Sequence, residues 1–171
     1  MKKVSYIIFI LSILSIVALV NVDALGFSNE RTATPIFDGN VLNGKYKLSL
    51  DECTAYDVTP DDMKEILHSG SKFKSKKWTC IEETWSDPLV VIRRYYFIRQ
   101  EDALIFAYYA SGSLPFKGWS PTHDIGDKTG WRTNDSLFFV KGKVLVFIQV
   151  NPSSLGRDFV RSIAESIEKK L

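Results

Sequence analysis

The sequence predicts an α+β fold, in which an antiparallel sheet of about four or five strands packs against a C-terminal amphipathic helix and a shorter N-terminal helix. Two observations support this prediction. Runs of β-branched and aromatic residues, separated by short polar turns, fill the middle and the end of the chain. The last segment then changes to apolar residues three and four positions apart, which is the period of a helix. With 171 residues, 45% of them hydrophobic and 25% charged, the chain is long enough for one domain.

The C-terminal part of the chain has the clearest pattern. The runs SLFFV and KVLVFIQV flank Lys141-Gly142, which predicts a hairpin with Gly142 at positive φ. After the breaker Asn151-Pro152, a helix with one apolar face is expected to cover one face of the sheet. The apolar face of this helix consists of Phe159, Val160, Ile163, Ala164, Ile167 and Leu171.

Three further strands are expected in the middle of the chain. Trp78–Trp85 is one of them, while Leu89–Arg99 and Ala103–Ala110 should form a hairpin across a short polar connector. Arg93 and Arg94 interrupt the second run at consecutive positions, so their side chains should point to opposite faces of the sheet. We expect one of them to reach solvent and the other to reach an edge or a carboxylate, because an unpaired buried charge is costly.

The N-terminal half should contribute one edge strand and one helix. Lys45–Leu50 alternates polar and apolar residues, as an edge strand does. The helix should begin with Thr59 as N-cap and Pro60 at its first position, and should end at Gly70. The basic segment Ser71–Lys77 that follows is interpreted as a solvated turn, with an anionic-lipid site as the alternative.

The first 24 residues have the features of an export signal. Lys2 and Lys3 precede a nearly uninterrupted apolar run from Val4 to Val22, and Ala24 lies where a signal peptidase would cleave. This run is longer than an ordinary signal sequence and close to the length that crosses a bilayer. Residues 1–24 are therefore either a signal peptide or a retained membrane anchor, followed by a flexible linker over 25–43 and a single domain over 44–171. In both cases the domain is expected outside the cytoplasm, secreted or anchored to the membrane.

Cys53 and Cys80 are the two cysteines of the chain, and both follow the export signal. Two thiols in an oxidising compartment most simply form one structural disulfide, so we predict a bridge between them. A metal site is not expected, because His68 and His123 lack ligand spacing. No cofactor is expected either.

Charge is nearly balanced along the chain. The formal net charge is +2, and loss of residues 1–24 removes Lys2, Lys3 and Asp23 and leaves 20 basic against 19 acidic side chains. This balance gives no reason to expect nucleic acid as a partner. Asn134-Asp135-Ser136 is an N-glycosylation sequon, which matters only in a host that uses it.

The long irregular segment from Ser111 to Asp135 is the candidate functional site. Long loops in compact domains are commonly functional, and this one combines aromatic with polar side chains. One interpretation is a ligand groove lined by the aromatic residues. The alternative is that they cap the open side of the sheet, with Asp127 hydrogen-bonded to the Ile125-Gly126 turn. The candidate ligand-binding residues are Phe116, Trp119, His123, Asp127, Trp131 and Arg132.

Three functions are compatible with these features. The first is a non-enzymatic exported module that binds a small ligand or an envelope protein. The second is a small hydrolase in which His123 acts as general base. Asp124 or Asp127 would orient this base, and Ser113 or Ser120 would be the nucleophile. The chain has no G-x-S-x-G elbow, so we prefer the binding module. The third is a structural protein of the cell envelope.

A resemblance adds to this interpretation. The order I-G-D at residues 125–127, a strand, a Lys-Gly turn, the strand VLVFIQV and a terminal helix with S-I-A-E-S-I resembles the closing portion of several families of small exported domains. These are lipoproteins and the extracellular sensor domains of membrane-bound kinases. The resemblance covers the last third of the chain and implies a strongly bent antiparallel sheet with a binding or sensing role. The chain lacks the lipidation cysteine and the kinase domain of those families, so no functional residue is carried over.

Overall fold

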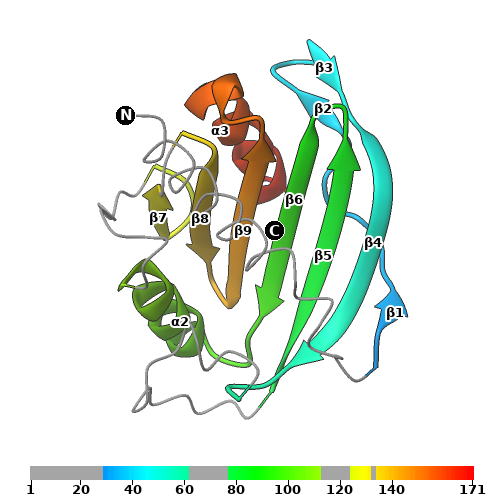
Figure 1. Ribbon diagram of the computed structural model, residues 1–171. Helices are drawn as coiled ribbons and strands as arrows, with labels where there is room; N and C mark the ends of the chain where they lie inside the picture. Colours follow the sequence, from blue (N-terminus) through cyan, green and yellow to red (C-terminus); the bar gives the residue numbers. More distant parts are fainter. Residues whose placement is uncertain (1–28, 62–76, 113–123, 132–133) are drawn as a thin grey trace, which may run out of the picture.

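The computed structural model describes residues 29–61, 77–112, 124–131 and 134–171. They form an antiparallel sheet with a helix on each face and a two-stranded ribbon beside it (Figure 1). The strands are β1 (Arg31–Thr32), β2 (Asn40–Val41), β3 (Tyr46–Lys47), β4 (Ser49–Val58), β5 (Trp78–Ser86), β6 (Leu89–Tyr96), β7 (Lys128–Trp131), β8 (Ser136–Lys141) and β9 (Val144–Asn151). The helices are α2 (Gln100–Gly112), the short 3-10 helix η3 (Ser153–Leu155) and α3 (Gly156–Glu168).

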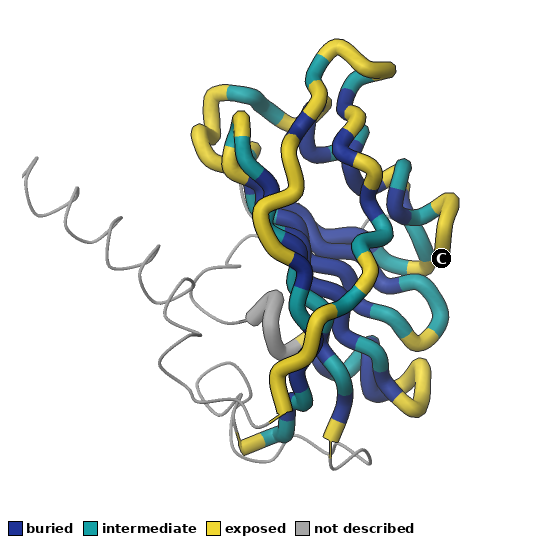
Figure 2. Tube along the Cα trace, turned by 90° about the vertical axis from the view of Figure 1, so that its right-hand side faces the viewer, coloured by how far each residue is buried: buried dark blue, intermediate teal, exposed yellow. Residues whose placement is uncertain are grey.

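The order across the large sheet is β1-β4-β5-β6-β9-β8-β7, and β2 and β3 form the ribbon. The predicted α+β class is therefore confirmed. The described residues contribute seven strands to the large sheet, which is more than the four or five expected. Buried positions gather along the middle of the sheet, while the turns and the beginning of β4 are exposed (Figure 2).

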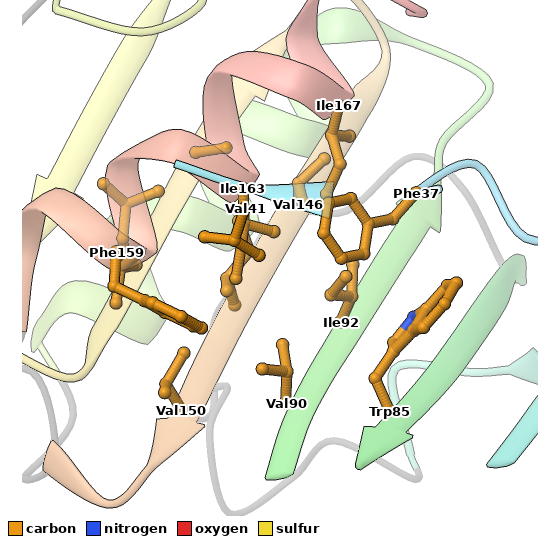
Figure 3. Close-up of a cluster of buried hydrophobic side chains, with 14 of the residues drawn as sticks. Phe37, Val41, Trp85, Val90, Ile92, Val146, Val150, Phe159, Ile163 and Ile167 are labelled. Carbon is orange, nitrogen blue, oxygen red and sulfur yellow. The ribbon is translucent and has the colours of Figure 1, made fainter. Parts of the chain in front are cut away.

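Helix α3 covers one face of the sheet, as its apolar pattern predicted. Phe159, Ile163 and Ile167 point from α3 onto Val146 and Val150 of β9 and the neighbouring strand β6 (Figure 3). Leu171 lies beyond the end of α3 and is exposed, so it does not belong to the buried face. The hairpin between β8 and β9 is also confirmed, with φ of 56° at Gly142.

The segment before β3 contributes to the same core, although its composition predicted a flexible linker. Phe37 and Val41 are 3% and 0% exposed, and Phe37 meets Trp85 edge to face at 5.1 Å. The backbone N–H of Leu42 donates to the hydroxyl of Ser162 on α3 at 2.8 Å. Residues 36–42 therefore close the side of the α3 core, and the folded domain begins before residue 44.

Helix α2 replaces a predicted strand. Ala103–Ala110 was expected to pair with β6, but it lies in a helix, and the partners of β6 are β5 and β9. An apolar run of eight residues fits a strand or a helix equally, and here the alanines favour the helix. Ala103, Phe106 and Ala107, which are three and four positions apart, are the buried residues that face the sheet.

The core under α2 is aromatic and lies on the opposite face of the sheet from α3. The ring of Phe106 lies 5.9 Å from Trp78, 5.2 Å from Tyr95 and 5.7 Å from Phe97 between ring centroids. The remaining buried members of this core are Cys80 of β5 and residues of β4, β8 and β9. The domain therefore has two cores, one on each side of the sheet.

The predicted disulfide between Cys53 and Cys80 is wrong, since both cysteines are free. The register pairs Cys53 with Glu83, and it pairs Cys80 with Tyr56. The two cysteines are thus offset by three residues along adjacent strands, and successive side chains alternate between faces, so they point to opposite sides of the sheet. A disulfide needs both side chains on one side at short separation.

Several predicted elements lie partly or wholly outside the described residues. Of the expected helix Thr59–Gly70, only Thr59–Asp61 is described, and Pro60 and Asp61 form a turn after β4. The export segment and nearly all of Ser71–Lys77 also fall outside. The predicted edge strand Lys45–Leu50 corresponds to β3 and the beginning of β4.

Candidate functional site

The predicted site residues divide into two groups. Asp127 and Trp131 are described, as is Asp124 of the hydrolase alternative. Phe116, Trp119, His123 and Arg132 lie outside the described residues, so their predicted roles stay predictions.

Asp127 organises a turn. Its Oδ2 accepts hydrogen bonds from the backbone N–H of Gly142 at 2.7 Å and from the side chain of Gln100 at 3.1 Å. Its own backbone N–H donates to the carbonyl of Val140 at 2.7 Å. This carboxylate therefore ties the start of β7 to the β8–β9 turn and to the start of α2. The predicted bond between Asp127 and the Ile125-Gly126 turn stays a prediction.

Trp131 lies at the edge of the sheet, beside α3. It ends β7, where it is paired with Leu137, and its half-buried ring packs against the α3 core. The guanidinium carbon of Arg157 lies 5.1 Å from the centre of this ring, and that of Arg161 lies 6.0 Å away. Both distances are in the range of cation–π interactions, which hold a guanidinium group against an aromatic face.

Two polar side chains complete this cluster. Asn134 accepts a hydrogen bond from Nε of Arg157 at 3.1 Å, and Asp124 pairs with Arg161 at 3.4 Å. Asp124 and Arg161 are both substantially exposed, so this pair contributes little to stability. We name the five residues Asp124, Trp131, Asn134, Arg157 and Arg161 the Trp131 platform.

The platform contains two arginines that the sequence did not single out. Arg157 and Arg161 are four residues apart on the polar side of a predicted amphipathic helix, where such spacing usually marks a solvated face. Their position next to Trp131 depends on β7 lying at the sheet edge alongside α3. Only the order of strands in the sheet could have revealed it.

The remaining notable polar groups are buried ion pairs. Arg93 and Arg94 point to opposite faces as predicted, but both are buried and each pairs with a carboxylate, so neither extends into solvent. Arg93 pairs with Glu82 on the α2 face, and Arg94 pairs with Glu83 on the α3 face at 2.8 Å.

Glu83 is the most completely enclosed carboxylate among the described residues. It is 0% exposed, and besides Arg94 it accepts hydrogen bonds from the backbone N–H groups of Ile36 and Phe37 and from the indole of Trp85. These donors explain how a charge can remain inside a core. Glu83 thus fastens the chain before the ribbon to the sheet, which is a structural role.

Cys80 is similarly enclosed on the other face. Burial raises the pKa of its thiol to about 12, and the hydrogen bond from Tyr56 and the positive charge of Arg93 offset part of this rise. Burial likewise raises the pKa of the Cys53 thiol. Both thiols are therefore protonated at neutral pH and poor nucleophiles.

Comparison of the chain with family models, with curated proteins and with solved structures found no match. Within the described ranges, no group of three His, Cys, Asp or Glu side chains is placed to hold a metal ion. No helix in this part of the chain is long and apolar enough to span a bilayer. The assignment of function therefore depends on the geometry of the platform and on the sequence.

Proposed function

We propose that this chain is an exported, non-enzymatic domain that binds a ligand with a carboxylate or another anionic group at the Trp131 platform. The observation that supports this most is the placement of two guanidinium groups against one half-buried indole ring. Guanidinium groups recognise carboxylates and phosphates through paired hydrogen bonds, and a ring that fixes them in advance reduces the entropy lost on binding.

The charges of the platform favour an anion. Its two arginines face one carboxylate, that of Asp124, which is 3.4 Å from Arg161. Among the described residues, the polar partner of Arg157 is the neutral side chain of Asn134. Arg157 thus keeps donors and a positive charge for a ligand.

The hydrolase alternative is weakened by the same contacts. Asp124 faces Arg161, and Asp127 holds the Gly142 turn, so each carboxylate that could orient His123 already has a structural partner. A binding role needs no such orientation. We therefore favour binding over catalysis.

We also propose that the apolar run from Val4 to Val22 keeps the domain on the outer side of a membrane as an anchor. The run is long enough to cross a bilayer, and β1 begins at Arg31, so the folded domain starts shortly after it. Intact-mass measurement of the chain from the membrane fraction tests this. Retention of residues 1–24 supports the anchor, and cleavage after Ala24 refutes it.

Binding can be tested by NMR with glucuronate as the anionic probe and glucose as the neutral analogue. In the full chain in nonionic detergent, glucuronate should shift the indole N–H resonance of Trp131 saturably, and glucose should not. The resonance is assigned by its loss in Trp131→Phe. Equal responses to both sugars would contradict an anionic ligand, and no response to either would refute the site for this ligand class.

Arginine variants separate the platform from general surface charge. Arg157→Gln should weaken glucuronate binding by about tenfold, because one charge-assisted hydrogen bond to the ligand is lost. Arg31→Gln is the matched control, since Arg31 is an exposed arginine on β1 at the opposite edge of the sheet. Equal weakening by the two variants would show non-specific attraction.

A further inference from the structure

Two large apolar side chains near one end of the sheet are exposed. Ile98, in the connection between β6 and α2, is 67% exposed, and Tyr108 on α2 is 65% exposed. Helical geometry places Tyr108, with Ile105, on the side of α2 opposite to Ala103, Phe106 and Ala107, which pack on the sheet. Helix α2 is therefore apolar on its outer side as well as on its inner side, which is unusual for a helix that faces water.

The register shows which end of the sheet this is. Tyr96 at the end of β6 is paired with Val144, next to the β8–β9 turn, and with Thr79 at the start of β5. The backbone N–H of Phe97 donates to the carbonyl of Lys143 at 2.9 Å, which places Ile98 beside this turn. Figure 1 shows α2 and the tip of β6 at the same end of the molecule, which we name the α2 end.

The N-terminal segment enters the domain at the same end. Strand β1 is antiparallel to β4, with Arg31 opposite Ala55 and Thr32 opposite Thr54. Residues before Arg31 therefore approach from the side of Val58, where β4 ends, which is the α2 end. The eight residues 23–30 separate the apolar run from β1 and can span at most about 29 Å.

We propose that the α2 end rests on the surface of the lipid bilayer in which residues 4–22 are anchored, with Ile98 and Tyr108 in the interfacial region. The short connection keeps this end close to the membrane, and isoleucine and tyrosine are side chains that the interface accepts. Arg99 and Lys143 are exposed beside Ile98 and suit lipid phosphates. Glu101 is exposed on the same side of α2 and offsets part of this positive charge. The docking therefore depends mainly on the apolar side chains. The inference rests on the anchor proposed above.

Three single-cysteine labels test the orientation. The full chain with Ile98→Cys, Tyr108→Cys or Leu89→Cys is labelled with bimane and reconstituted in vesicles of phosphatidylcholine and phosphatidylglycerol that contain a headgroup nitroxide lipid. The native thiols are buried, so the introduced thiol is the reactive one. Leu89 is the control, because it is 43% exposed at the β5–β6 turn, at the opposite end of the sheet.

The nitroxide should quench the labels at positions 98 and 108 several-fold more than the label at position 89. Equal quenching at all three positions, whether strong or weak, overturns the inference. Flotation of the same vesicles separates the two proposals. A chain that floats but shows equal quenching keeps its anchor and has no docked end, whereas a chain that stays in the soluble fraction fails both.

Discussion

At the scale of single residues, burial decides what an ion pair contributes here. Arg94–Glu83 and Lys77–Asp57 have the same separation of 2.8 Å, but the first pair is almost fully enclosed and the lysine of the second is largely exposed. In the enclosed pair the loss of one partner leaves a charge that water cannot reach. In the exposed pair water and salt replace the lost partner.

Glu83→Gln should therefore lower the free energy of unfolding by about 3–5 kcal/mol, because Arg94 remains buried without a countercharge. Lys77→Ala is the control and should leave this free energy nearly unchanged. Urea unfolding of both variants measures the difference. Similar values for the two would mean that Glu83 does not hold the segment before the ribbon to the sheet.

The buried thiol predicts a response to alkaline pH. The pKa of Cys80 is raised by burial from 9.0 to about 12, so the folded state keeps a proton that the unfolded chain loses first. The corresponding stability is fully present below pH 9 and is lost as the pH rises toward 12. Burial also raises the pKa of Tyr56 and Tyr95, which adds to the same loss.

Thermal unfolding from pH 7 upward should accordingly show a melting temperature that falls above pH 9, where the free thiol ionises. In Cys80→Ala this fall should be shallower, whatever the starting stability of the variant. If the melting temperature fell equally steeply with pH in the variant and in the parent chain, Cys80 would not be a cause of the alkaline destabilisation.

At the scale of elements, the β8–β9 hairpin and α3 could be predicted because their patterns are local. Alternating runs around Lys141-Gly142 need a turn, and the three- and four-residue spacing from Phe159 to Ile167 needs an apolar surface to cover. Helix α2 could not be predicted, because its apolar run has no period that separates a helix from a strand. The predicted pairing of β6 with Ala103–Ala110 was wrong for the same reason.

Two glycines in the C-terminal hairpin region test how tightly these elements pack. Gly126 and Gly142 both have positive φ, but a Cβ on Gly126 would overlap the carbonyl oxygen of Val140, whereas a Cβ on Gly142 meets nothing within 4 Å. Gly142→Ala should cost about 1–2 kcal/mol from backbone conformation alone. Gly126→Ala should cost clearly more, as measured by urea unfolding, and equal costs would show that β8 yields easily at Val140.

At the scale of the whole molecule, long-range pairing creates the features that sequence patterns miss. Strand β7 pairs with β8, and β8 pairs with β9. Helix α3 follows β9 and packs over this part of the sheet, so α3 lies beside β7. Trp131 was a candidate because its loop combines aromatic with polar residues. Its neighbours Arg157 and Arg161 could be recognised only from this order of strands. The prediction of a disulfide was wrong for a related reason, because the register of β4 against β5 puts the two cysteines on opposite faces.

The central proposal also concerns the whole molecule: the domain works outside the cytoplasm, at a membrane. Cells that express the full chain can be treated intact with a membrane-impermeant amine reagent, and the chain then recovered from the membrane fraction. Lys45, exposed in the turn of the β2–β3 ribbon, should carry the reagent before lysis, while a cytoplasmic marker stays unmodified. Modification of Lys45 only after lysis would contradict the account.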